Sequence, residues 1–146
     1  MPDPEADEDF ARDSADQAAV RHANRQFYDA FEARDLDAMS DVWSHDDRVS
    51  CTHPGWRTLH GWGAVSSSWF ALFAGPQPLQ FILTNERVGV EGSAAWVTVD
   101  ENLISAEGSG TVAAMNVFVR ARGRWRLVAH HGSAVAPQGP QGLPDS

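Results

Sequence analysis

The sequence predicts an α+β protein in which helices cover one face of a curved antiparallel sheet. Apolar residues recur at three- and four-residue spacing up to about residue 75, as in amphipathic helices, and at two-residue spacing from Leu79 onward, as in strands. Short turns join the later segments, so neighbouring strands should be antiparallel. A curved sheet closed at one end by helices forms a cone, and we expect a cavity inside it.

Three helices are expected in the first half of the chain. The first begins near Ser14 or Asp16, and its apolar face consists of Val20, Ala23, Phe27, Ala30 and Phe31. Asp35 is a suitable N-cap for a second, short helix. A third helix starts at Trp62 and ends at a Gly-Pro pair, with the glycine as C-cap. Residues 1–14 are acidic and poor in apolar side chains, which predicts a disordered tail.

Strands are expected over the second half of the chain. A short strand at residues 48–52 precedes four long ones, at 79–90, 94–105, 111–122 and 125–135. The last segment, 137–146, is rich in proline, glycine and glutamine and is predicted to be disordered. The sequence therefore predicts one domain over residues 15–136, which agrees with a length of 146 residues.

The composition excludes several classes of partner and cofactor. The formal net charge is −9, which argues against nucleic acid and anionic membranes as partners, since both are bound through basic patches. The single cysteine, Cys51, excludes an intrachain disulfide and a four-cysteine zinc site. Neither a membrane-spanning run nor a signal peptide is evident, so we expect a cytoplasmic protein, and no phosphate-binding glycine loop or other cofactor motif is found.

The segment after the short strand is the first candidate for a site. His53, Pro54, Gly55 and Trp56 follow one another, and the proline ends the strand because it cannot donate a ladder hydrogen bond. An imidazole and an indole at the end of a strand are placed to project into a cavity. The alternative is an ordinary surface turn, for which His-Pro-Gly is equally typical.

Polar residues inside apolar rows are the second candidate. On the second long strand Glu101 shares a face with Ala95, Val97, Val99 and Leu103, which predicts a buried carboxyl with a raised pKa unless a bulge turns it outward. Asn116 interrupts an apolar row in the same way on the next strand. His130 and His131 point to opposite faces, so one of the two should face the cavity, and the other is a candidate for an interface.

Two segments carry a resemblance to a known family. Residues 27–37, Phe-Tyr-Asp-Ala-Phe-Glu-Ala-Arg-Asp-Leu-Asp, and residues 125–133, Trp-Arg-Leu-Val-Ala-His-His-Gly-Ser, together with the order of elements, resemble the SnoaL-like branch of the nuclear transport factor two superfamily. That superfamily includes ketosteroid isomerase, scytalone dehydratase, limonene epoxide hydrolase and the association domain of calmodulin-dependent kinase. The resemblance covers about residues 15–135. It implies a cone-shaped, cystatin-like α+β barrel with an internal pocket, usually a homodimer through the outer face of the sheet.

Carrying over the catalytic residues of ketosteroid isomerase gives a poor match. Its pocket tyrosine falls near Phe27, with Tyr28 adjacent. Its general-base aspartate falls near Thr52 or His53, and its oxyanion-hole aspartic acid falls on Asn116. No catalytic residue is kept in kind, so steroid isomerase activity is not supported. The two aspartates and arginine of the epoxide hydrolase are not evident either. The polyketide cyclase activity that names the branch implies an acid–base group, for which His53, Glu101 or His130 are the candidates.

Two classes of function follow from these residues. The first is a small acid–base enzyme of the isomerase, dehydratase or cyclase type that acts on a small apolar or carbonyl-bearing molecule. Its predicted catalytic residues are the base His53, its partner Glu101, the oxyanion donor Asn116, and His130. Its predicted ligand-binding residues are Tyr28, Trp56, Trp69, Phe118 and His131. The second is a non-catalytic, dimeric ligand-binding or assembly module.

A metal site is a third and weaker option. It would use His53, Glu101 and one of the two adjacent histidines, His130 or His131, as a facial set of ligands.

Overall fold

The computed structural model describes residues 3–76 and 78–137, and it confirms the α+β class. The helices are α1 (Pro4–Ala33), α2 (Leu36–Val42) and α3 (Trp62–Phe73). The strands are β1 (Ser50–Thr52), β2 (Leu59–His60), β3 (Gln80–Glu91), β4 (Ala94–Ser105), β5 (Gly108–Ala121) and β6 (Arg124–Ala134). No helix of the described residues is long and apolar enough to cross a membrane.

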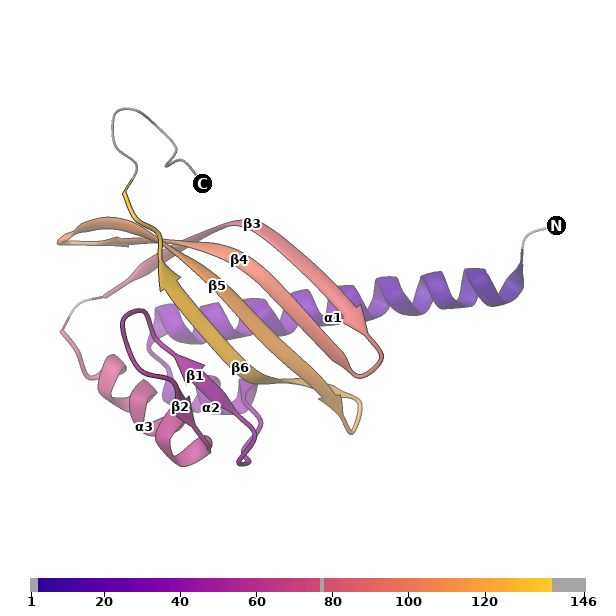
Figure 1. Ribbon diagram of the computed structural model, residues 1–146, viewed down its shortest axis with the longest axis horizontal. Coiled ribbons are helices and arrows are strands. Elements are labelled where there is room, and N and C mark those ends of the chain that lie inside the picture. Colours follow the sequence, from indigo (N-terminus) through magenta and orange to yellow (C-terminus); the bar gives the residue numbers. More distant parts are fainter. Residues whose placement is uncertain (1–2, 77, 138–146) are drawn as a thin grey trace.

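The strands form a single curved sheet in the order β2-β1-β6-β5-β4-β3 (Figure 1). The four long strands make an antiparallel meander, as the short turns predict. The short strand β1 returns to the other end of the meander and pairs in parallel with β6. This pairing sets Cys51 opposite His130, so the loop that follows β1 begins directly beside the last strand. Residues far apart in sequence therefore meet at one end of the sheet.

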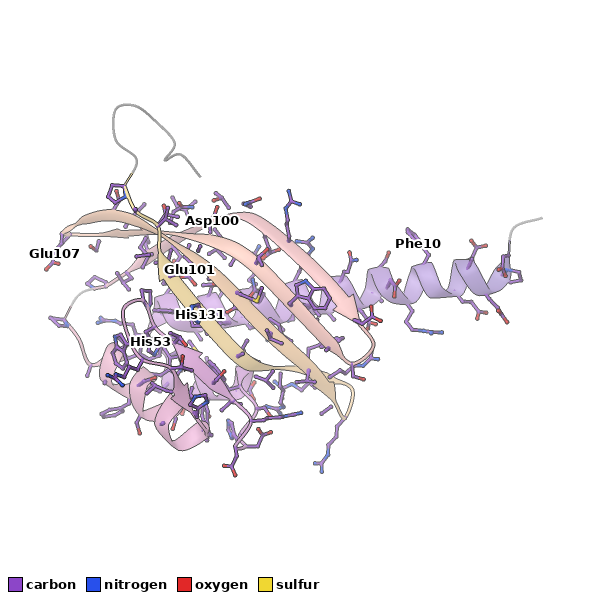
Figure 2. All side chains as sticks on the ribbon, in the orientation of Figure 1. Phe10, His53, Asp100, Glu101, Glu107 and His131 are labelled. Carbon is purple, nitrogen blue, oxygen red and sulfur yellow. The ribbon has the colours of Figure 1, made fainter. Side chains whose placement is uncertain are left out.

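The start of α1 differs from the prediction. Residues 1–14 are predicted to be disordered, whereas the helix already begins at Pro4. Asp3 caps it by accepting a hydrogen bond from the Glu5 N–H at 3.0 Å, and proline and acidic residues in the first turn suit a helix N-terminus. This half of α1 extends beyond the sheet and leaves Phe10 exposed (Figures 1 and 2). The predicted C-terminal tail lies, except for Pro137, outside the described residues.

The second half of α1 packs against the concave face of the sheet. Phe27 is completely buried, and its ring contacts the rings of Tyr28, Trp69 and His130 at centroid distances of 4.9, 5.6 and 4.9 Å. Such aromatic contacts each contribute about 0.5–1.5 kcal/mol beyond the burial of area. The cluster joins α1, α3 and β6, and it therefore fixes which side of α1 faces the strands.

A β-bulge in β3 shapes the same interface. The register with β4 shifts between Thr84 and Arg87, and Asn85 lies in the left-handed region with φ 57°. Asparagine tolerates this conformation better than most residues do. The extra residue brings Glu86 toward α1, where its carboxylate bonds with Asn24 and Arg21.

Candidate functional site

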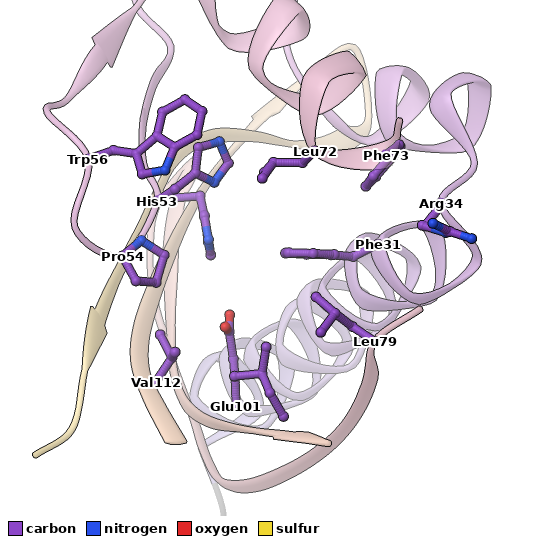
Figure 3. A pocket seen from close by; sticks show the side chains of 12 residues that line it. Phe31, Arg34, His53, Pro54, Trp56, Leu72, Phe73, Leu79, Glu101 and Val112 are labelled. Atoms are coloured by element: carbon purple, nitrogen blue, oxygen red, sulfur yellow. The ribbon is translucent and has the colours of Figure 1, made fainter. Parts of the chain in front are cut away.

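A cavity of about 210 Å³ opens between the end of α1, the loop after β1, α3 and the concave face of the sheet (Figure 3). Its walls are mainly apolar. The residues that line it are Phe31, Arg34, His53, Pro54, Trp56, Leu72, Phe73, Leu79, Glu101, Leu103, Val112 and His130. Three of the predicted catalytic residues, His53, Glu101 and His130, therefore meet at one cavity. An apolar chamber with a few convergent polar groups is the usual form of a small-molecule site.

Glu101 supplies the carboxyl group of the cavity. It lies on the inward face of β4, is 3% exposed, and accepts a hydrogen bond from the Tyr28 hydroxyl at 2.6 Å. Burial raises the pKa of Glu101 to about 7, because a carboxylate loses its hydration there, and the hydrogen bond from Tyr28 only partly offsets this. At neutral pH the group is thus close to its point of half ionisation, where a carboxyl can both take up and release a proton.

Tyr28 stands behind this carboxyl rather than in the cavity lining. Burial, and then the negative charge of Glu101, raise the pKa of Tyr28 far above its ordinary value. The phenol therefore stays protonated and acts as a fixed hydrogen-bond donor to Glu101.

His53 is held as a neutral imidazole in the loop that leaves β1. The Ser68 hydroxyl donates to the carbonyl of Val65 at 2.6 Å, so its oxygen accepts from Nε2–H of His53 at 2.9 Å. Burial lowers the pKa of His53 to about 4. Its edge also packs against the indole of Trp56, with ring centroids 4.8 Å apart. Because an imidazole with so low a pKa has little affinity for a proton at pH 7, His53 is a weaker candidate for the general base than Glu101.

His130 is the second neutral imidazole. It lies on β6, and its Nδ1 is 2.5 Å from the side-chain oxygen of Asn116. Burial, with a smaller contribution from the nearby His53 and His131, lowers the pKa of His130 to about 3. Among the described residues, Nε2 of His130 has no hydrogen-bond partner, and this is the nitrogen available to a ligand.

Asn116 is completely buried beneath His130 and does not line the cavity. Its side-chain nitrogen donates to Asn24 at 2.9 Å and to Tyr28 at 3.2 Å, which engages both N–H bonds of the amide. In this arrangement Asn116 holds other site residues in place and has no free N–H for the oxyanion role that the sequence suggested.

The predicted ligand-binding residues separate into three groups. Trp56 lines the cavity and is partly exposed at its mouth. Trp69 and Phe118 are buried in the core behind the lining. The rings of Trp69 and His53 pack edge-on there, with their centroids 4.8 Å apart. His131 is exposed on the outer face of the sheet, while His130 faces inward. The alternation along the last strand required this division but could not say which histidine faces which side.

Several residues of the lining were not predicted. Phe31 belongs to the predicted apolar face of the first helix and Leu103 to the same strand face as Glu101, and neither is predicted to have a role in a site. Leu72 and Phe73 come from the end of α3. Arg34 directly precedes the predicted N-cap of the second helix. Its backbone has φ 54° at the end of α1, and its side chain donates to the Gly75 carbonyl at 2.6 Å at the edge of the cavity. A break between two helices is the sequence signal that marks this corner.

The described residues contain no group of three or more His, Cys, Asp or Glu side chains arranged to hold a metal ion. His131, one of the alternatives in the facial set, lies on the opposite side of the sheet from Glu101.

The chain belongs to the SnoaL-like family, whose domain model matches residues 20–137. A structure from Streptomyces avermitilis, proposed to be a dehydratase of the NTF2-like family, is 36% identical, with a TM-score of 0.78 over 85% of this chain and 99% of that one. A structure from Thiobacillus denitrificans, proposed to be a calcium/calmodulin-dependent protein kinase type II association domain, is 39% identical, with a TM-score of 0.68 over 78% of this chain and 93% of that one.

A curated relative is the F-box protein SKIP8 of Arabidopsis thaliana, which is 32% identical over 117 residues. The match covers 80% of this chain and 50% of the relative, so the chain spans about half the length of that protein.

Proposed function

We propose that the protein is an acid–base enzyme for a small, largely apolar molecule, with Glu101 as the group that transfers the proton. The observation that carries this proposal is a buried carboxyl with a pKa of about 7, bonded by Tyr28 and lining a mainly apolar cavity. A pKa near the working pH is what a general acid or base requires. The 36% identity to a structure proposed to be a dehydratase supports the same class of reaction.

The geometry suits a single-group elimination or isomerisation. The Glu101 carboxylate removes a proton from a carbon of the substrate, and the electron pair of that C–H bond forms a new double bond. In a dehydration the C–O bond breaks, and the protonated Glu101 returns its proton to the departing hydroxyl, which leaves as water. In an isomerisation an existing C=C bond of the substrate breaks, and its electron pair takes the proton back from Glu101 at another carbon. Throughout, Tyr28 remains bonded to the carboxyl and the apolar walls exclude water.

The first test uses the wild-type protein and a general probe of proton abstraction, 5-nitrobenzisoxazole. A carboxylate takes its ring C–H proton, the N–O bond breaks, and a coloured cyanophenolate forms. We expect saturable ring opening at pH 8, much faster than with the same concentration of acetate, because Glu101 is ionised at that pH but poorly hydrated. A rate equal to that of acetate, without saturation, would contradict the proposal.

The second candidate function is a non-catalytic ligand-binding or assembly module. It is favoured by the 39% identity to a structure proposed to be an association domain and by the match to part of an F-box protein. In that case 5-nitrobenzisoxazole would bind in the cavity, seen as shifts of the Trp56 and His53 resonances, and would come back unchanged.

We further propose that two copies pair through the outer face of the sheet. This face carries exposed apolar side chains on three adjacent strands: Ile82, Trp96, Ile104 and Met115. His131, paired in register with Met115, lies on the same face and would be buried by the partner. Apolar groups spread over neighbouring strands favour an interface more than isolated exposed ones do.

Replacing Met115 with glutamate is expected to raise the dissociation constant of this dimer by at least roughly a hundredfold, since a carboxylate would lose its hydration in an apolar interface. Sedimentation equilibrium at several concentrations measures the effect. Phe10→Glu, which alters an exposed side chain on the projecting part of α1, is the matched control and should leave the mass unchanged. A monomeric wild-type protein at high micromolar concentration would overturn the dimer.

A further inference from the structure

A series of hydrogen bonds runs from the surface, through the buried side chains of Asn24 and Asn116, to the back of the cavity. Arg21 pairs with Glu86 at 2.6 Å, and the other oxygen of Glu86 accepts from the Asn24 side-chain nitrogen at 3.1 Å. The Asn24 side-chain oxygen accepts from the Asn116 nitrogen at 2.9 Å. The Asn116 oxygen then meets Nδ1 of His130 at 2.5 Å. The proposed function uses none of these residues, although the last of them, His130, lines the cavity.

In each hydrogen bond of this series only one of the two groups can act as the donor. A carboxylate can only accept, so Glu86 must receive an N–H from Asn24, which turns the oxygen of that amide toward Asn116. For the same reason Asn116 must present its nitrogen to Asn24 and its oxygen to the histidine. The partner of an amide oxygen has to be a donor, and His130 therefore carries its proton on Nδ1.

The direction of these hydrogen bonds also sets what the cavity offers to a ligand. With its proton on Nδ1, neutral His130 presents a lone pair at Nε2, which has no partner among the described residues. His53 presents a second lone pair at Nδ1, because its Nε2–H is donated to Ser68. Tyr28 accepts from Asn116 and thus directs its own proton to Glu101. Above the pKa of Glu101, the side chains of His53, Glu101 and His130 are therefore all acceptors toward the cavity.

We propose that Glu86 is a positioning residue that acts through Asn24 and Asn116 and fixes His130 as a hydrogen-bond acceptor. The cavity then selects a neutral, apolar ligand that carries a hydroxyl donor, such as a phenol or an alcohol, over a ligand that carries only a carbonyl group. The ligand class rests on the proposed function, since it takes this cavity as the substrate site. A hydroxyl group can donate a hydrogen bond to Nε2 of His130. A carbonyl oxygen would instead face the lone pair on Nε2, and neither of these two acceptors would have a donor.

The first experiment reads the proton position directly. Long-range ¹H–¹⁵N NMR of the imidazoles at pH 8 should show a protonated Nδ1 and an unprotonated Nε2 for His130. Tyr28 also holds the Asn116 amide, because it must accept from that amide while it donates to Glu101. The Glu86 variants are therefore made in Tyr28→Phe. Tyr28→Phe alone should keep the tautomer, because Glu86 still sets the direction of both amides. In Tyr28→Phe/Glu86→Gln the new side chain has an N–H of its own, so both amides can turn around and the single tautomer should be lost, whereas Tyr28→Phe/Glu86→Asp keeps an acceptor and should retain it. A wild-type His130 protonated on Nε2, or a Gln variant with an unchanged tautomer, would overturn the positioning role.

The second experiment reads the ligand class with phenol and acetophenone, also at pH 8, where Glu101 is ionised. We expect phenol to bind the wild-type protein at least about tenfold more tightly, because Glu101 and both histidines of the lining are acceptors and reject an analogue that lacks the donor. The donors Arg34 and Trp56 lie instead at the edge and mouth of the cavity. Compared with Tyr28→Phe alone, the ratio should fall toward equality in Tyr28→Phe/Glu86→Gln and should persist in Tyr28→Phe/Glu86→Asp. Equal affinities in the wild-type protein, or a preference for acetophenone, would overturn the inference about the ligand.

The two proposals fail in different ways. If the wild-type protein opens 5-nitrobenzisoxazole but His130 is protonated on Nε2, the positioning inference is wrong and the proposed function stands. If the tautomer and the preference for phenol are as expected but no proton is abstracted, the inference stands for a binding site and the proposed enzyme is wrong.

Discussion

Replacing Glu101 with glutamine is expected to lower the rate of ring opening of 5-nitrobenzisoxazole by about 10²–10⁴-fold, the usual contribution of a positioned general base. Glutamine has nearly the same shape and still accepts from Tyr28 through its oxygen, so the cavity should be preserved. Only the ability to take up a proton is lost. The comparison of initial rates at pH 8, with unfolding curves to confirm that both proteins are folded, measures the effect.

The pH dependence of the same reaction gives a second, independent readout. The wild-type rate should rise with pH and level off, with a midpoint at the pKa of Glu101, about 7. Since the hydrogen bond from Tyr28 lowers the pKa of Glu101, Tyr28→Phe should move this midpoint upward while leaving activity at high pH. His53→Asn is the matched control within the cavity. If it abolished activity while Glu101→Gln did not, the base would be His53, as the sequence first suggested.

The sequence carries the fold and much of the cavity because both depend on local periodicity. The change of spacing near residue 79 predicts where helices give way to strands, and the short turns predict the meander. The alternation along β4 also places Glu101 inward, since it shares its side of the strand with apolar residues that belong to the core. The parallel pairing of β1 with β6 is different. It joins residues nearly 80 positions apart, and no local pattern encodes it.

The residues that hold the site in place depend on features that the periodicity of apolar residues does not reveal. Glu86 reaches Asn24 only because the bulge in β3 changes the side of the strand on which it lies, and a strict alternation would assign it otherwise. Asn24 itself lies on α1 beside the apolar stripe, where a polar residue is ordinarily read as solvated. The apolar row that Asn116 interrupts predicts that this residue faces inward. It does not predict its role, because the neighbouring groups determine which way the side-chain amide oxygen and nitrogen point. The roles of such residues emerge only from the complete network.

A strong dependence of stability on pH is the second large effect that we expect. Burial depresses the pKa values of His53 and His130 to about 4 and 3, from 6.5. Their contribution to stability is present above pH 6.5 and is lost as the pH falls through those values, because the unfolded chain binds protons first. The raised pKa of Glu101 acts in the opposite sense. Its contribution is complete below 4.5 and is lost as the pH rises through about 7.

These opposing terms give a definite slope between pH 4.5 and 6.5. In that window the unfolded chain carries protons on both histidines, and the folded protein carries one, on Glu101. The net difference of one proton lowers the free energy of unfolding by about 1.4 kcal/mol per pH unit as the pH falls, or about 3 kcal/mol over the window. Urea unfolding at a series of pH values measures this slope. Asp41 and Asp46 have lowered pKa values and titrate below the window.

Glu101→Gln provides the control, because it removes only the opposing term. The difference then becomes two protons, and the loss between pH 6.5 and 4.5 should grow to about 5 kcal/mol. Relative to the wild-type protein, the variant should also gain about 3 kcal/mol of stability from pH 4.5 to 8, where the wild type must keep a buried carboxylate ionised. Parallel curves for the two proteins would mean that Glu101 titrates alike in the folded and unfolded states. The same result would remove the physical basis for its role as the proton-transfer group, so stability and activity test one property of one side chain.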